Sequence, residues 1–137
     1  MHAALLAELP GLAEHIRWPK ELHEAPGRTV EIETLSGKRV RIRKADHRGG
    51  WRRILSGWWS CCEAEAMDYV LANLPIGARV VTPMFDGLLV CCAAADAERV
   101  AARLRAVMLG GCRAAGFVAG VKVGVGNTWA AAENGAV

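Results

Sequence analysis

Two apolar runs separated by an Asp-Gly dipeptide constrain the middle of the chain. The first run leads into Phe85-Asp86-Gly87, and the second leads away through residues 88–92. Asp-Gly is a common hairpin-turn dipeptide, because these residues tolerate the backbone conformations of tight turns. The pattern predicts a β-hairpin over residues 79–92 with Asp86 at or beside its tip. Asp86 is then either a turn residue only or a carboxylate that a sheet holds at its rim to bind a metal ion.

The length of 137 residues, with 53% hydrophobic and 23% charged, suits one domain with a substantial core. We therefore expect a single domain over residues 1–137. The five cysteines show neither a C-x-x-C spacing nor an even count, which favours reduced thiols in a cytoplasmic protein. The chain has no apolar run of about 18 residues and no basic region ahead of an apolar N-terminal stretch, so we expect neither membrane spanning nor secretion.

Positive charge is concentrated in residues 38–53. Eight Lys and Arg side chains there face a single acid, an excess of seven in a chain whose total charge is +3. Residues 29–35 and 38–44 alternate apolar and polar side chains around Ser36-Gly37, which predicts a hairpin. Its second strand would present Arg39, Arg41 and Arg43 on one face. Such a face is either the solvated side of an edge strand or a surface that binds nucleic-acid phosphates.

Apolar residues at helical spacing predict the helices. Residues 2–16 predict a first helix that ends at Trp18-Pro19, and a short second helix follows over residues 20–24. Residues 51–74 predict a long helix, or two abutting ones. Its tryptophans could stack on bases, but beside an apolar stripe tryptophans more often have a packing role, which we expect here. Its expected core-facing stripe is Ala64, Met67, Leu71 and Leu74.

Residues 93–110 form the clearest helical pattern, which Gly110-Gly111 caps or interrupts. Residues 118–125 alternate again and predict a last strand. The order of these elements predicts an α+β fold: an antiparallel sheet around a central hairpin with helices packed on one face, plus a small N-terminal part of helices and a hairpin. The apolar face of the helix over residues 93–110 is expected to comprise Ala97, Val100, Ala101, Leu104, Val107 and Met108.

This order of features resembles the C-terminal part of family A (DNA polymerase I-like) DNA polymerases, in a divergent, phage-like form. Residues 33–43 (ETLSGKRVRIR) resemble the hairpin at the end of the fingers, with its T-L-x-G-R-R signature. Residues 48–71 resemble the long helices that approach the primer-template minor groove, and residues 78–90 resemble the palm hairpin with the third catalytic motif. Residues 95–108 and 121–129 resemble the following palm helix and the last strand with its G-x-x-W ending.

The resemblance implies a palm-type sheet, with residues 1–50 as the end of the fingers and residues 51–137 as the palm-like part. It implies that Asp86 is a catalytic, metal-binding residue in a two-Mg²⁺ site for nucleotidyl transfer. Phe85 and Gly87 stand where the family has His and Glu, and neither can ligate a metal. The residues expected to contact primer-template DNA are Lys38, Arg39, Arg41, Arg43, Arg48, Arg52, Arg53, Ser56 and Ser60, with Arg52 at the family's minor-groove arginine position and the two serines at those of its Asn and Gln.

Two parts of the family's machinery have no counterpart here: the D-x-S-x-x-E palm strand and the R-x-x-x-K-x-x-x-F-G-x-x-Y helix that grips the triphosphate. We therefore expect a C-terminal palm fragment of a DNA-directed DNA polymerase that is inactive alone. An N-terminal partner chain would supply the second carboxylate and bind the deoxynucleoside triphosphate. The alternatives are a non-catalytic DNA-binding module, a decayed prophage polymerase remnant, and an unrelated α+β interaction domain in which Asp86-Gly87 is only a turn.

Overall fold

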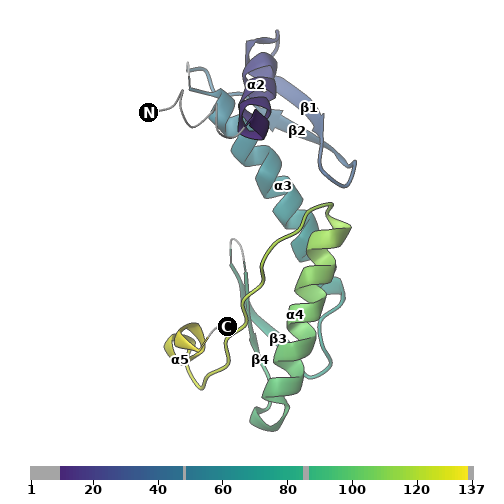
Figure 1. The fold of residues 1–137 in the computed structure, drawn as a ribbon, viewed down its shortest axis with the longest axis vertical. Helices are drawn as coiled ribbons and strands as arrows, with labels where there is room; N and C mark the ends of the chain where they lie inside the picture. The colour runs from purple at the N-terminus through teal and green to yellow at the C-terminus, as the bar shows by residue number, and fades with distance from the viewer. Residues whose placement is uncertain (1–9, 48, 85–86, 136–137) are drawn as a thin grey trace. The chain divides into compact units, whose positions relative to one another are not determined.

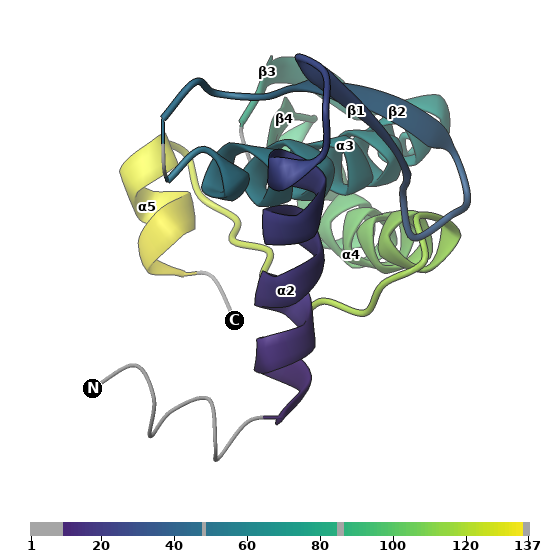
Figure 2. The same cartoon turned by 90° about the horizontal axis from the view of Figure 1, so that it is seen from above.

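The computed structural model describes residues 10–47, 49–84 and 87–135 (Figure 1, and from above in Figure 2). These residues form an α+β fold, as the sequence predicts, with two separate two-stranded antiparallel sheets. The elements in chain order are α2 (Pro10–Glu24), β1 (Thr29–Glu33), β2 (Arg39–Arg43), α3 (Trp51–Ala72), β3 (Arg79–Pro83), β4 (Leu88–Cys91), the 3₁₀ helix η1 (Ala94–Asp96), α4 (Ala97–Ala114) and α5 (Trp129–Asn134).

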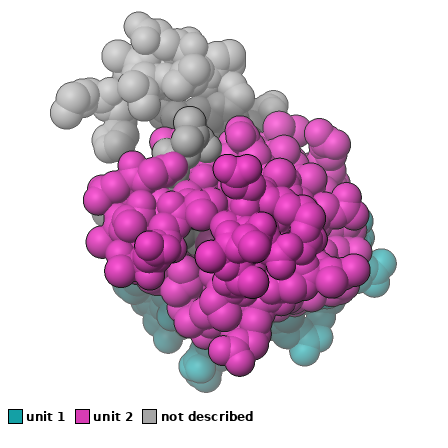
Figure 3. Space-filling model, turned by 90° about the horizontal axis from the view of Figure 1, so that it is seen from below, with its two compact units in different colours: residues 1–61 teal, residues 62–137 magenta. Residues whose placement is uncertain are grey.

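The chain divides into two compact units, residues 1–61 and residues 62–137 (Figure 3). The division falls inside α3, so this helix contributes its first half to unit 1 and its second half to unit 2. The resemblance implies a single domain whose two parts meet at residue 50, where the long helix begins. Each unit has a hydrophobic cluster of its own.

In unit 1, β1 and β2 form the predicted hairpin. At its turn the Thr34 N–H donates to the Lys38 carbonyl at 2.8 Å, and the Gly37 N–H donates to the Thr34 carbonyl at 2.9 Å. Gly37 has φ +87°, a left-handed conformation that glycine adopts without steric cost. The Ser36-Gly37 pair therefore fixes the register of the strands, and with it the face on which each β2 side chain lies.

The hairpin packs α2 and the first half of α3 against one of its faces (Figure 2). Val30, Ile42 and Ile54 are buried at the centre of this cluster, and Ile54 is fully shielded from solvent. Trp18 and Trp58 close its edge with ring centroids 5.5 Å apart in an edge-to-face arrangement. The packing role expected for the tryptophans is thus confirmed at Trp58.

The sequence prediction for the start of the chain is wrong at Trp18-Pro19, because α2 continues through this pair to Glu24. A proline inside a helix removes one backbone hydrogen bond and bends the axis. Pro19 is less than 2% exposed, and Trp18 packs on the unit 1 cluster, so burial offsets this cost. Residues 2–9 of the predicted helix over 2–16 lie outside the described part of the chain.

In unit 2, β3 and β4 form the second predicted hairpin, and the Met84 N–H donates to the Gly87 carbonyl at 2.9 Å beside its turn. Phe85 and Asp86 lie outside the described residues. Val81 is an extra residue in β3, which makes a β-bulge between the Val80 and Thr82 pairs. The helices cover one face of this hairpin, as predicted: the cluster joins β4 to α3 and α4 through Leu88, Val90, Val70, Leu104 and Val107.

The buried face of α3 in unit 2 differs from the predicted stripe. Met67 and Leu74 are partly buried as expected, but Ala64 and Leu71 are exposed, and the buried side chains are instead Cys62, Ala66 and Val70. The cause is a close approach of α4: a Cβ on Gly111 would lie 2.6 Å from the Ala66 carbonyl oxygen. That approach selects the face of α3 that carries Ala66.

Gly110-Gly111 therefore lies inside α4 and does not cap it. The helix ends instead in a Schellman motif, in which the Phe117 N–H donates to the Cys112 carbonyl and the Gly116 N–H to the Arg113 carbonyl. Gly116 has φ +89°, as the motif requires. Of the predicted buried face, Val100, Leu104 and Val107 are confirmed.

The predicted last strand over residues 118–125 is absent from the described structure, in which residues 117–126 form no regular element. Glycines at 120 and 124 weaken a strand because they offer no side chain to pack and lose the most backbone entropy. A short helix that the sequence did not predict follows: the Thr128 Oγ1 accepts from the Ala131 N–H at 3.2 Å and caps α5. None of the described helices has the length and apolarity needed to cross a membrane.

Candidate nucleic-acid interface

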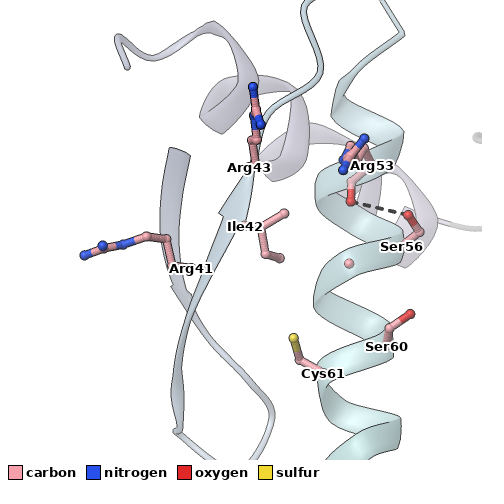
Figure 4. A pocket seen from close by; sticks show the side chains of 8 residues that line it. Arg41, Ile42, Arg43, Arg53, Ser56, Ser60 and Cys61 are labelled. Atoms are coloured by element: carbon pink, nitrogen blue, oxygen red, sulfur yellow. Dashed lines mark hydrogen bonds between the residues drawn. The ribbon is translucent and has the colours of Figure 1, made fainter. Parts of the chain in front are cut away.

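A groove of about 410 Å³ lies between β2 and the first half of α3 in unit 1 (Figure 4). We call it the arginine groove. Its apolar floor forms because β2 turns Ile42 toward the helix at the level of Gly57, where a Cβ would already meet the Ile42 side chain at 3.2 Å. The remaining lining residues are Arg41, Arg43, Arg53, Ser56, Ser60 and Cys61.

Two of the three β2 arginines are neutralised by β1. The strand register places Glu33 opposite Arg39 and Glu31 opposite Arg41. The Arg39 Nε lies 3.7 Å from a Glu33 carboxylate oxygen, and Arg41 donates to the Glu31 carboxylate from both Nε, at 3.0 Å, and Nη2. The hydrogen bond to Glu31 raises the pKa of Arg41. The basic face predicted for β2 is therefore only partly available to a ligand.

Arg43 and Arg53 are the two groove arginines whose charge is available to a ligand. Both side chains are exposed, and neither makes an ion pair with any described residue. Arg43 escapes pairing because its partner across the hairpin is Thr29, which carries no charge. Figure 4 shows the Arg41 side chain pointing away from α3, whereas Arg43 and Arg53 lie at the same end of the groove on its two opposing walls.

The serines predicted to contact nucleic acid both line this groove. Ser56 and Ser60 lie four residues apart on one side of α3. The Ser56 Oγ donates to the Arg53 carbonyl at 3.3 Å, a weak bond within its own helix. Four predicted contact residues, Arg43, Arg53, Ser56 and Ser60, thus come together with available polar groups.

The other predicted contact residues lie elsewhere. The Arg52 guanidinium lies 5.4 Å from the Trp51 ring centroid, and the Lys20 ammonium lies at the same distance from that ring. Trp51 therefore holds two cations by cation–π attraction. Lys38 is exposed at the hairpin turn, and Arg48 lies outside the described residues.

Lys44, which contributes to the basic excess of the segment, has an internal role. It is 8% exposed, and its ammonium donates to the backbone carbonyls of His23, at 3.3 Å, and Ala25. These carbonyls lie at and just beyond the end of α2, where helix carbonyls lack intrahelical partners and attract a cation. Lys44 thus stabilises unit 1 and presents little charge to a ligand.

Sequence reasoning missed the groove's apolar members, Ile42, Gly57 and Cys61. The alternation of β2 indicates only that Ile42 faces inward, and a lone glycine in a helix gives no sign of what packs on it. Only the pairing of β2 with α3 brings these residues together with the arginines.

The metal site expected at Asp86 stays a prediction, because Asp86 lies outside the described residues. Among the residues that the structure does describe, no three His, Cys, Asp or Glu side chains gather in a way that could hold a metal ion. No family model, characterised protein or solved structure matches this chain.

Proposed function

We propose that this chain is the C-terminal palm segment of a divergent family A-like DNA polymerase that binds nucleic acid through the arginine groove. The order of elements supports the proposal: a basic hairpin, a long helix, a hairpin that carries Asp86, and an amphipathic helix follow one another as the resemblance implies. The observation that carries it is the groove itself, which Arg43 and Arg53 line at one end and where neither pairs with an acid among the described residues. Clustered, exposed arginines are the usual electrostatic feature of phosphate-backbone contact.

Binding to primer-template DNA tests this proposal. The wild-type chain should bind a fluorescent primer-template with an affinity that falls steeply as salt rises, whether or not Mg²⁺ is present. Arg43→Ala and Arg53→Ala should each weaken binding about tenfold, because each removes a charge-assisted phosphate contact. Each should also reduce the slope of log affinity against log salt by roughly 0.7 to 0.9.

Arg41→Ala is the matched control, since it removes the same charge from the neighbouring β2 position, where Glu31 already neutralises it. Its effect should be less than twofold. An affinity that stays constant between low and high salt would rule out phosphate binding.

The role of Asp86 follows from phosphoryl-transfer chemistry. Divalent ions, when bound, neutralise charge on the transferring phosphoryl group, and rigid carboxylates must hold them. Because this chain is proposed to supply one such carboxylate, the others would come from an N-terminal polymerase chain, which would also bind the nucleoside triphosphate.

We expect the isolated chain to show no nucleotide addition, and a mixture with an N-terminal polymerase fragment to extend a primer in the presence of Mg²⁺. Asp86→Ala should abolish extension by the mixture and leave primer-template binding within twofold of wild type. Full primer extension by the Asp86→Ala mixture would remove Asp86 from the proposed metal site.

A non-catalytic nucleic-acid-binding module is the second candidate, and the location of the arginine groove favours it. All groove residues lie within unit 1, so binding needs neither Asp86 nor any residue after Cys61. This candidate, like a decayed remnant, predicts the same salt-dependent binding but no primer extension with any N-terminal fragment.

A further inference from the structure

The segment that joins α4 to α5 has the character of a strand without a partner. Residues 117–126 run between the two helices as an extended trace (Figure 1). From Phe117 to Val123 the odd-numbered residues are partly buried, whereas the even-numbered residues between them are exposed. This alternation has the period of a β-strand that packs one of its faces on its own domain.

The backbone of this segment is unpaired. No N–H or carbonyl of residues 118–127 makes a backbone–backbone hydrogen bond with any other described residue. Among the described residues, the β3–β4 sheet of the same unit has two strands and does not include the segment as a third. A row of unpaired backbone groups along an extended segment is a template for pairing with a strand of another chain.

Gly120, on the exposed face of the segment, provides an independent observation. Its φ is not positive, and a Cβ built on it would meet nothing within 4 Å. Neither the backbone conformation nor the packing of the unit therefore requires a glycine here, although glycine weakens a strand. Glycine inside a strand often marks a place that another backbone approaches closely. The space at Gly120 is thus available to a side chain of a neighbouring strand.

The sequence of the segment is self-complementary in one antiparallel register. If two copies pair about a two-fold axis at Val121, Gly120 of each copy lies opposite Lys122 of the other. In the same register Val118, which is 93% exposed, lies opposite Gly124. A register centred on Lys122 would instead place two like charges directly opposite each other, which destabilises a sheet. The glycine spacing therefore favours the register about Val121.

We propose that residues 118–124 bind a second copy of this chain, as antiparallel strands that pair about Val121. The two segments form a β-ribbon shared by two protomers, in the two-fold arrangement that is commonest among homodimers. An interface of two short strands is small, so the dimer is weak and depends on protein concentration. The ribbon belongs to unit 2, whereas the arginine groove belongs to unit 1, so this proposal does not depend on nucleic-acid binding.

Sedimentation equilibrium and hydrogen exchange test for the dimer and for its backbone pairing. Over a series of protein concentrations up to about 1 mM, the wild-type chain should change reversibly from monomer to dimer. Exchange followed by NMR should find the amides of residues 118–124 unprotected at low concentration. In the dimer every second amide of this segment should exchange several-fold more slowly, because alternate residues of an antiparallel pair share hydrogen bonds.

Two substitutions at Gly120 test the register. Both variants should fold as the wild type does, because a Cβ at this position meets nothing in its own chain, and circular dichroism would verify this. Gly120→Glu places a carboxylate opposite Lys122 at two symmetric positions of the dimer, and Gly120→Lys places an ammonium there. The Kd of the Gly120→Lys dimer should be about tenfold above that of Gly120→Glu, and the difference should shrink at high salt.

Three outcomes would contradict the proposal. A wild-type chain that stays monomeric at the highest concentration would rule out the dimer. A dimer in which the amides of residues 118–124 stay unprotected would have its interface elsewhere. Equal Kd values for the two Gly120 variants would overturn the register about Val121. Each of these results would leave the proposed nucleic-acid binding intact, because the salt dependence of DNA binding and the Arg43 and Arg53 variants test that separately.

Discussion

Lys44 shows how one residue can differ from the neighbours it resembles in sequence. Arg39, Arg41, Arg43 and Lys44 belong to one basic run, yet only Arg43 is both exposed and unpaired within the described structure. The difference comes from the partner of each side chain: a glutamate for Arg39 and Arg41, the end of α2 for Lys44, and an uncharged threonine across from Arg43. Charge counted along a sequence therefore overestimates the charge that a ligand meets.

Replacing Lys44 by methionine should destabilise the protein. Lys44→Met keeps most of the apolar stem but leaves the His23 and Ala25 carbonyls without their ammonium donor. We expect the free energy of unfolding, measured in urea by circular dichroism, to fall by about 1 to 3 kcal/mol. The exposed Lys38 provides the control: Lys38→Met should change the free energy of unfolding by less than about 0.5 kcal/mol. Equal stability of the two variants would contradict the internal role of Lys44.

At the scale of elements, the described structure confirms the predictions that depend on short stretches of sequence. Both hairpins were predictable because alternation and turn dipeptides act over a few residues, as at Ser36-Gly37. The buried face of α3 could not be predicted in this way, because the close approach of Gly111 in α4 decides which side of α3 is covered. The end of α2 was misplaced for the same reason, since tertiary burial of Trp18 and Pro19 outweighs the local cost of the proline.

The candidate site divides in the same way. The charge pattern of the sequence predicts its arginines, and the family resemblance implies its serines, but the ion pairs of Arg39 and Arg41 depend on strand register. Sequence alone therefore predicted the members of the groove better than their availability.

The contact between α3 and α4 gives a prediction of its own. Gly111→Ala would place a methyl group 2.6 Å from the Ala66 carbonyl oxygen, and because that atom belongs to the backbone, one helix must shift. We expect a loss of about 1 to 3 kcal/mol in the free energy of unfolding, despite the better helix propensity of alanine.

Gly110→Ala is the neighbouring control, because its Cβ would meet only the Tyr69 ring, at 3.2 Å, and a side chain can yield. In urea, the free energy of unfolding of Gly110→Ala should be well above that of Gly111→Ala. If Gly111→Ala instead stabilised the protein, as propensity alone would predict, the close approach of the two helices would be wrong.

At the scale of the whole molecule, each unit has its own cluster, and the tryptophans are unevenly divided. Trp18, Trp51, Trp58 and Trp59 belong to unit 1, and Trp129 belongs to unit 2. In a Trp129→Phe background, fluorescence therefore reports on unit 1, and whether the two units unfold together becomes measurable.

Truncating one core at a time would show whether the chain is the single domain expected from its length. In the Trp129→Phe background, Ile54→Ala in unit 1 should lower the stability seen by fluorescence by about 2 to 5 kcal/mol. Val107→Ala in unit 2 should lower the stability seen by the helical circular dichroism signal, with a much smaller change in the stability seen by fluorescence. The reason is that Val107 belongs to the hydrophobic cluster of unit 2. If each variant shifted the unfolding transition equally by fluorescence and by circular dichroism, the chain would unfold as one cooperative domain.

The β-bulge at Val81 has a consequence for how the hairpin of unit 2 could change during evolution. Because one extra residue stands between the Val80–Val90 and Thr82–Leu89 pairs, it resets which side chains of β3 face the helices. Loss of a single codon there would exchange inward and outward side chains along one arm of the hairpin that leads to Asp86. Point substitutions in β3 should accumulate far more readily than changes in its length.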